Sequence, residues 1–206
     1  IREMFLLMIP TLIGIFGYQI NEMIDTRFAA ALTAGTVSAL NYSSRLYLLP
    51  IGVFAISLSV VIFPNLSQAA VKKQMNVVKS QIERGLNMLA FFVIPSQIVL
   101  IFYSKEIVSL IYKRGAFSED MIVVTSQALT FYSVGLLFFS TIHLLTRSHY
   151  VFKDRKRPVI SSFVGIGINI ALDFLLYKQY KHMGLTFATS TAAMVNYLIL
   201  LLSLNK

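Results

Sequence analysis

The sequence predicts an all-α, polytopic membrane protein with six transmembrane helices. Hydrophobic residues make up 56% of the 206 residues, charged residues only 13%, and the mean hydropathy is +0.72. Soluble domains carry about 25% charged residues, and a soluble core of this size cannot bury so much apolar surface. Several apolar stretches approach or exceed the ~20 residues that a helix needs to cross the hydrocarbon core. Lipid is therefore the predicted solvent for most of the chain.

Each apolar segment is predicted to be a helix, because a backbone in lipid must satisfy its own hydrogen bonds. The second and third segments contain Pro50 and Pro95, and we expect kinks at both. The six predicted spans, which together form a single helical domain, are residues 4–31, 37–63, 86–103, 121–145, 159–177 and 184–204.

Two shorter helices are predicted between the spans. Residues 76–83 are predicted to form a short amphipathic helix that leads into the third span and lies along the cytoplasmic surface. Residues 105–112 read as a short interfacial helix that ends at Gly115, a residue type common just after helix ends.

The basic residues gather in two connections, one between the second and third spans and one between the fourth and fifth. They are Lys72, Lys73, Lys79 and Arg84 in the first connection, and Arg147, Lys153, Arg155, Lys156 and Arg157 in the second. Cytoplasmic loops carry such an excess, so both connections and, by even spacing, both chain ends are predicted to face the cytoplasm. The net charge of +9 thus indicates contact with the lipid bilayer and not with nucleic acid.

Several classes of protein are excluded by what the sequence lacks. It has no cysteine, so disulfides and thiolate metal sites are absent. The three histidines have no ligand-like spacing, and neither a phosphate loop nor a nucleophile elbow occurs, so we expect a non-enzyme without a resident cofactor. Because the chain starts at Ile1 and stops at Lys206, we expect it to be a piece of a longer protein.

The acids within the spans are the most informative residues, because charges at membrane depth are rare and costly. Asp25 follows Asn21 by four residues, and Asp173 follows Asn169 by four, so each pair shares one helix face. Carboxylate and amide oxygens suit a small hard cation, and hydroxyls near the start of the sixth span would add ligands. The alternatives are a structural ion pair of Asp25 with an arginine, or polar helix packing.

Arg45 lies inside the second predicted span and also has two interpretations. Its long side chain can reach back to the outer interface, as arginines near helix ends do. Alternatively, it faces a water-filled cavity and binds an anionic group such as a phosphate through its two-pronged guanidinium. Depth in the membrane does not separate these alternatives.

Six sequence motifs stand out along the chain. They read QINEMID at 19–25, SALNYSSRLYLLPIGVF at 38–54, SVVIFPNLS at 59–67, YKRGAFS at 112–118, NIALD at 169–173 and GLTFATS at 184–190. Together they resemble the MurJ/MviN lipid II flippases of the multidrug/oligosaccharidyl-lipid/polysaccharide (MOP) exporter superfamily. The resemblance covers nearly the whole chain, and the combination is specific although each motif alone is weak.

The resemblance implies the fold and several residue roles. The chain would be helices 7–12 of about 14, one lobe beside a central cavity, without the N-terminal lobe and the last two helices. Arg45 matches an arginine that engages the pyrophosphate-bearing head group. A sodium site is implied at Asp25, Asn169, Asp173, the Leu185 carbonyl and Thr189. Some members carry an acid before the arginine where this chain has Ser44, so a local ion pair is missing there.

The expected function is a lipid II flippase of the bacterial cytoplasmic membrane, working by alternating access and coupled to a cation or to the membrane potential. Its substrate would be the undecaprenyl-pyrophosphate-linked peptidoglycan precursor. The alternative is a related MOP exporter of another polysaccharide lipid or of a drug cation. A membrane enzyme would need clustered Asp, His or metal ligands at one interface, and a structural subunit would tolerate loss of Asp25 and Asp173.

Overall fold

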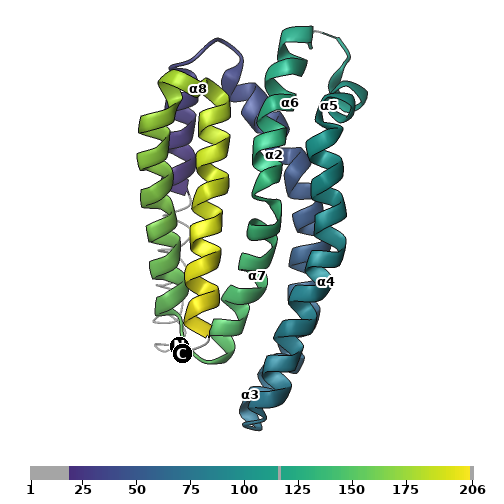
Figure 1. Ribbon diagram of the computed structural model, residues 1–206, viewed down its shortest axis with the longest axis vertical. Coiled ribbons are helices and arrows are strands. Elements are labelled where there is room, and N and C mark those ends of the chain that lie inside the picture. Colours follow the sequence, from purple (N-terminus) through teal and green to yellow (C-terminus); the bar gives the residue numbers. More distant parts are fainter. Residues whose placement is uncertain (1–18, 116, 205–206) are drawn as a thin grey trace, which may run out of the picture.

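The computed structural model describes residues 19–115 and 117–204, which form helices joined by short connections (Figure 1). This confirms the predicted all-α class. Residues 4–18 of the first predicted span lie outside the described part. The elements are a helical segment at residues 19–30, α2 (Thr36–Pro50), the π-helix η1 (Ile51–Ile56), α3 (Ser57–Val71), α4 (Met75–Phe102), α5 (Ser104–Tyr112), α6 (Glu119–Val134), α7 (Leu136–Val151) and α8 (Lys156–Leu204).

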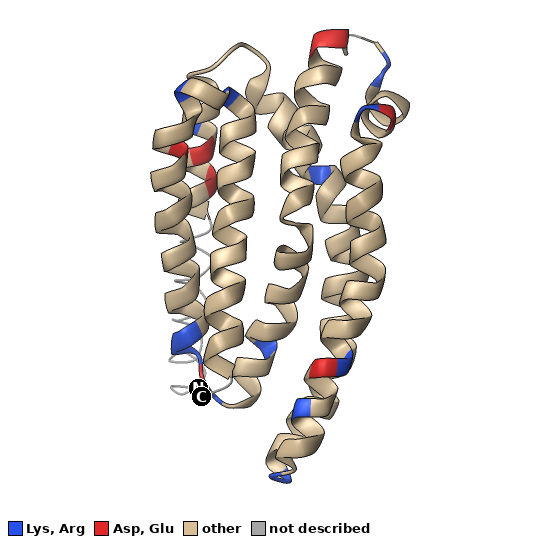
Figure 2. Ribbon diagram, in the orientation of Figure 1, with Lys and Arg blue, Asp and Glu red and all other residues tan. Residues whose placement is uncertain are grey.

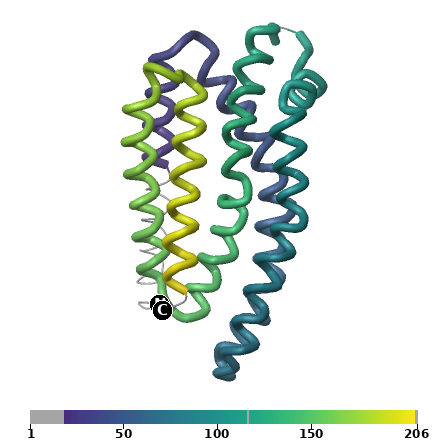
Figure 3. The backbone as a smooth tube through the Cα atoms, viewed as in Figure 1, coloured from purple at the N-terminus to yellow at the C-terminus, as the bar shows by residue number. Residues whose placement is uncertain are grey.

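The long helices run side by side, and α8 folds back on itself as two antiparallel legs (Figures 1 and 3). The reversal is at Lys181, whose φ of 50° and ψ of −132° are not helical. The two legs contain the fifth and sixth predicted spans. They approach closely beyond the turn, because a Cβ on Gly184 would lie 2.9 Å from the Leu176 carbonyl oxygen.

The second predicted span is one long helical run from α2 through η1 to α3, with a wider turn where a kink was expected. Pro50 ends α2, and the π-helix of six residues follows directly. Proline has no N–H to donate and crowds the preceding turn. The chain accommodates it with a π turn, in which bonds span five residues. The Ser57 hydroxyl donates across this interval to the Gly52 carbonyl at 3.2 Å.

The third predicted span belongs to a longer helix than expected. Residues 76–83 are not a separate surface helix: they are early turns of α4, which continues without a break through Pro95 to Phe102. The apolar side chain of Val78 packs against Leu66 and Ala69 of α3, which explains why the segment stays in line with α4. Figure 1 shows this α3–α4 pair projecting beyond the neighbouring helices.

The predicted interfacial helix at 105–112 is present as α5, but it ends at Tyr112 and its C-cap is Lys113 instead of Gly115. Gly115 has a φ of 60° in the following loop. The Thr130 hydroxyl of α6 donates to the Ser104 hydroxyl at 2.9 Å and fixes the start of α5.

The fourth predicted span is broken, because α6 and α7 meet at Gly135 at an angle of 46°. This bend could not be predicted from the sequence, since a glycine in an apolar run also permits ordinary close packing. The reason lies in α8: a Cβ on Gly135 would lie 2.7 Å from the Ser190 hydroxyl oxygen and 2.9 Å from its Cα. Only a glycine lets the bend rest against that helix.

The surface confirms that lipid is the solvent for much of the protein. Large apolar side chains are openly exposed, including Phe91 (73%) and Leu175 (68%). Within the described residues, three helices are long and apolar enough to cross a membrane, and the bent α6–α7 pair together makes a fourth. Charged residues lie mostly toward the two ends of the bundle (Figure 2). The buried core is aliphatic and includes Leu89, Leu129 and Leu144.

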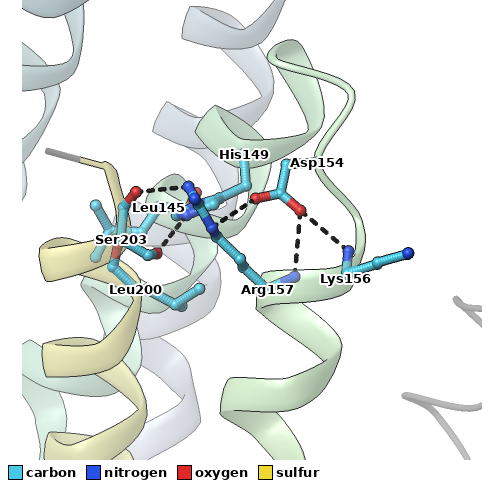
Figure 4. Close-up of polar contacts among 7 residues, drawn as sticks. All are labelled: Leu145, His149, Asp154, Lys156, Arg157, Leu200 and Ser203. Atoms are coloured by element: carbon cyan, nitrogen blue, oxygen red, sulfur yellow. Dashed lines mark hydrogen bonds and ion pairs between the residues drawn. The ribbon is translucent and has the colours of Figure 1, made fainter. Parts of the chain in front are cut away.

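A polar network joins three parts of the chain at one end of the bundle (Figure 4). The buried ring of His149 on α7 contacts the Ser203 hydroxyl on α8 at 2.7 Å and the Leu145 carbonyl at 2.9 Å. Arg157 donates to the Ser203 carbonyl at 2.7 Å and pairs with Asp154 at 3.3 Å. Asp154 also accepts from backbone N–H groups at the start of α8.

Candidate functional site

The two acid-bearing helix faces predicted from spacing meet each other. The carboxyl groups of Asp25, on the segment at 19–30, and Asp173, on the first leg of α8, lie within hydrogen-bonding reach. Asp173 is fully buried, and its Oδ1 has no hydrogen-bond partner. Two carboxylates in contact repel each other unless a proton or a cation lies between them. This pair therefore needs such a partner.

The amide of Asn169 lies beside the two acids and can be oriented in two ways. With its nitrogen toward Asp25, it donates to Asp25 Oδ1 at 2.9 Å and to Asn21 Oδ1 at 2.8 Å, and its oxygen accepts from the Thr189 N–H at 3.1 Å. In the opposite orientation, its nitrogen donates to the Thr189 hydroxyl at 3.3 Å. Its oxygen then faces the oxygens of Asp25 and Asn21, an arrangement that a bound cation favours.

The sixth span contributes Thr189 and Leu185, which contact each other: the Thr189 hydroxyl donates to the Leu185 carbonyl at 3.0 Å. The neighbouring hydroxyls that the sequence could not rank are occupied elsewhere. Thr186 and Thr191 bond to carbonyls of their own helix, and Ser190 bonds to the Phe131 carbonyl. The structure thus groups Asp25, Asn169, Asp173, Leu185 and Thr189 through a chain of direct contacts.

The donor chemistry of this group fits a hard monovalent cation. It offers two carboxylates, an amide, a hydroxyl and a carbonyl, all of them oxygen ligands. In the described part of the chain, no three His, Cys, Asp or Glu side chains converge as a transition metal would require. The alternative of a structural ion pair between Asp25 and an arginine is wrong for this conformation, since no arginine among the described residues lies within ion-pair distance of Asp25.

Arg45 lies apart from the acid cluster, in the third turn of α2, with an exposed side chain. No carboxylate in the described residues pairs with it. The hydroxyl of the preceding residue, Ser44, donates to the Asn41 carbonyl at 2.9 Å. The guanidinium is therefore available to an anionic ligand.

Aromatic residues hold the turn of α2 that precedes Arg45. The Tyr112 hydroxyl donates to the Tyr42 carbonyl at 3.2 Å, and the two rings are 4.8 Å apart. Phe117 packs edge-on against Tyr42 at 5.4 Å. Burial raises the pKa of the Tyr112 hydroxyl, and the nearby Arg45 only partly offsets this, so the hydroxyl remains a neutral donor at pH 7. Tyr112 and Phe117 of the motif at 112–118 thus pack against α2, a structural role that the sequence did not indicate.

A cavity of about 620 Å³ lies among the segment at 19–30, α2, α6, α7 and α8. Asp25, Asn169 and Thr189 line it, and so do the aromatic side chains of Tyr47 and Tyr132. Arg45 is not among its lining residues, although its neighbour Ser44 is. Arg45 lies at the edge of the face of α2 that lines the cavity, since Asn41 and Leu48, one turn before and after it, are lining residues.

Comparison with known proteins identifies the family. The family model described as "Lipid II flippase MurJ" matches residues 1–206. The chain belongs to the MurJ lipid II flippase family. A "Probable lipid II flippase MurJ" of Vibrio cholerae is 34% identical over 194 residues, which cover 94% of this chain and 37% of that protein. The chain thus spans well under half the length of this MurJ relative.

Solved structures agree with the MurJ assignment. "Lipid II flippase MurJ, inward closed conformation" matches with a TM-score of 0.88 at 34% identity, covering 96% of this chain and 42% of that one. A MOP superfamily transporter from Pyrococcus furiosus matches with a TM-score of 0.80 at 15% identity, covering 95% and 43%, and this likeness concerns the fold alone. The predicted recognition and the MOP-type fold are confirmed. The names of these relatives describe flippases and transporters, in agreement with the expected non-enzyme.

Proposed function

We propose that this chain is the second six-helix lobe of a lipid II flippase, which moves lipid-linked peptidoglycan precursor across the bacterial cytoplasmic membrane by alternating access. The N-terminal lobe of the same parent protein would form the other wall of the central cavity, and two more helices would follow this chain. The connections at residues 72–74 and 152–155 would face the cytoplasm, together with both ends of the chain.

The observation that carries this proposal is the exposed Arg45, which has no acidic partner among the described residues. An unpaired charge at membrane depth is costly against lipid, so it belongs on a face that lines a polar space. Its guanidinium fork matches two oxygens of a pyrophosphate. The head group of lipid II carries that group, and the arginine would attract it into the cavity.

Growth rescue in a strain depleted of its own lipid II flippase tests this proposal. We expect the parent protein to rescue growth, Arg45→Ala to fail and Arg45→Lys to rescue only in part, since lysine keeps the charge but loses the fork. Arg27→Ala is the matched control, because Arg27 is also an exposed arginine and makes no ion pair among the described residues. Membrane levels of each variant are compared by immunoblot.

Full rescue by Arg45→Ala would overturn the head-group role. If the unmodified parent fails to rescue despite normal levels, export of a different polysaccharide lipid or of a drug cation becomes the leading function.

Cation coupling is the second part of the proposal. Asp25, Asn169, Asp173, Thr189 and the Leu185 carbonyl would hold a sodium ion, which supplies the positive charge that the paired carboxylates need. The ligands come from the first, fifth and sixth spans. Their closure around the ion would bias the inward–outward equilibrium, provided that one of the two states binds it better.

A further inference from the structure

The bend at Gly135 is held by side chains from two other helices. In an unbroken helix, the Gly135 N–H would donate to the Phe131 carbonyl. Here it donates to the Tyr132 carbonyl at 3.1 Å. The Ser190 hydroxyl of α8 donates to the Phe131 carbonyl at 2.7 Å, and the Gln97 amide of α4 donates to the Val134 carbonyl at 3.0 Å. Such replacement partners are what permits a broken helix inside a membrane.

Ser190 has two carbonyls within reach. Its hydroxyl oxygen lies 2.7 Å from the Phe131 carbonyl oxygen and 3.4 Å from that of Tyr132. A small shift of α8 along α6 therefore exchanges one acceptor for the other without leaving the hydroxyl unpaired. The Tyr132 carbonyl would thus serve as the acceptor in a second arrangement, as an element that switches between states requires.

The same serine follows directly after Thr189 of the acid cluster. Thr189 contacts Asn169 and Leu185, so the position of this turn of α8 depends on how the cluster is arranged. Gly135 is in contact range of the Ser190 backbone as well as of its side chain. Movement of the turn is thus passed to the bend by van der Waals contact and by a hydrogen bond.

On its other side, the bend packs against the helix that carries Arg45. Tyr132, before the bend, stacks on Tyr47 of α2 with ring centroids 4.8 Å apart. Phe139, after the bend, has its ring centroid 5.5 Å from the same tyrosine. Tyr47 is buried and follows Arg45 by two residues. A change of angle between α6 and α7 therefore acts on the part of α2 next to Arg45.

We propose that Ser190 is a positioning residue that couples the cation-type cluster, through the bend at Gly135, to the turn of α2 that carries Arg45. The proposal rests on the function proposed above. Among the described residues, the Ser190 hydroxyl bonds to the Phe131 and Tyr132 carbonyls and to none of the proposed cation ligands. It links the turn of α8 after Thr189 to the carbonyls at the bend, and the bend to Tyr47.

The test uses the purified parent protein and two measurements. The first is the rise in thermal midpoint on replacing choline chloride with sodium chloride at equal ionic strength. The second is the ratio of the Kd values for lipid II in the same two salts. Allosteric couplings typically change affinity by about fivefold or more, so we expect at least a fivefold ratio for the parent protein. Ser190→Ala should bring the ratio within about twofold of 1 while keeping the thermal rise.

Thr191→Ala is the matched control. This hydroxyl is one residue further along α8 and bonds only to the Phe187 carbonyl of its own helix, so both measurements should match those of the parent. If Ser190→Ala gives no monodisperse protein, Ser190→Cys replaces it, because cysteine has a similar size and only a weak donor. For Ser190→Cys we likewise expect a Kd ratio within about twofold of 1.

The outcomes separate this inference from the proposed function. If sodium neither raises the thermal midpoint of the parent nor changes its Kd for lipid II, the proposed cation site is wrong and the coupling is wrong with it. If the parent shows both and the Ser190 variant keeps the ratio, the coupling role is wrong while the cation site stands. Loss of the thermal rise in the Ser190 variant would make Ser190 part of the cation site itself, which also overturns the inference. So would loss of the ratio in Thr191→Ala.

Discussion

At the scale of single residues, spacing predicted which side chains share a helix face but not which faces meet. The four-residue intervals placed Asn21 with Asp25 and Asn169 with Asp173. That the two pairs face each other depends on the packing of helices more than a hundred residues apart, for which one sequence holds no periodic signal. The hydroxyls show the same limit: Thr189 and Ser190 look alike in sequence and have different partners.

Asp173→Asn should abolish the sodium-induced thermal stabilisation of the parent protein. A ligand at a hundredfold excess over its Kd stabilises a protein by about 2.7 kcal/mol, so the parent should gain several degrees. Asparagine removes one of the two carboxylate charges that the proposed sodium ion would neutralise. Asp154→Asn is the control, because Asp154 lies in a connection and caps α8, and asparagine caps equally well. An undiminished sodium effect in Asp173→Asn would exclude this carboxylate as a ligand.

At the scale of elements, apolar length located the helices well and their interruptions poorly. The predicted helices at 37–63 and 105–112 are present, while the π turn after Pro50 and the bend at Gly135 are not features that hydropathy can report. Both interruptions depend on atoms elsewhere in the structure. The bend depends on two distant side chains. Ser190 lies 55 residues after Gly135, and Gln97 lies 37 residues before its acceptor Val134.

Gly184→Ala should lower the thermal midpoint of the protein, whereas Gly167→Ala should leave it unchanged or raise it slightly. A Cβ at Gly184 would lie 2.9 Å from the Leu176 carbonyl oxygen, so the two legs of α8 must separate. Overpacking of this kind costs about 1–3 kcal/mol. A Cβ at Gly167 meets nothing within 4 Å, and alanine is the better helix former there. Equal thermal midpoints for the two variants would show that the two legs of α8 can move apart without loss of stability.

At the scale of the whole molecule, the charge pattern predicted an orientation that the arrangement of helices makes easy to test. The connections at residues 72–74 and 152–155 and the network of Figure 4 are the features that should lie at the cytoplasmic end. Helix α5 and the turn at Lys181 should lie at the outer end. The family could be predicted from the combination of motifs. Five of them lie on helical elements, and the one at 112–118 begins at the last residue of α5 and continues into the connection to α6.

Cysteine labelling in intact cells should give opposite results at the two ends of the parent protein. The chain has no native cysteine, so Lys105→Cys and Lys72→Cys each introduce a unique thiol within it, and both lysines are exposed. A membrane-impermeant maleimide should label Lys105→Cys from outside and should label Lys72→Cys only after the cells are opened. Labelling of Lys72→Cys in intact cells would reverse the proposed orientation. Detergent-treated membranes, in which both should react, provide the control for thiol reactivity.

The network in Figure 4 has a consequence for biosynthesis. Ser203 supplies both its hydroxyl to His149 and its carbonyl to Arg157, so a single late residue completes the contacts among α7, the following connection and both legs of α8. On a ribosome, the chain is made from its N-terminal end, and His149 and Arg157 emerge long before Ser203 does. This end of the chain's helix bundle therefore closes only after the helix that carries Ser203 has been released into the membrane, well after α7 has been made.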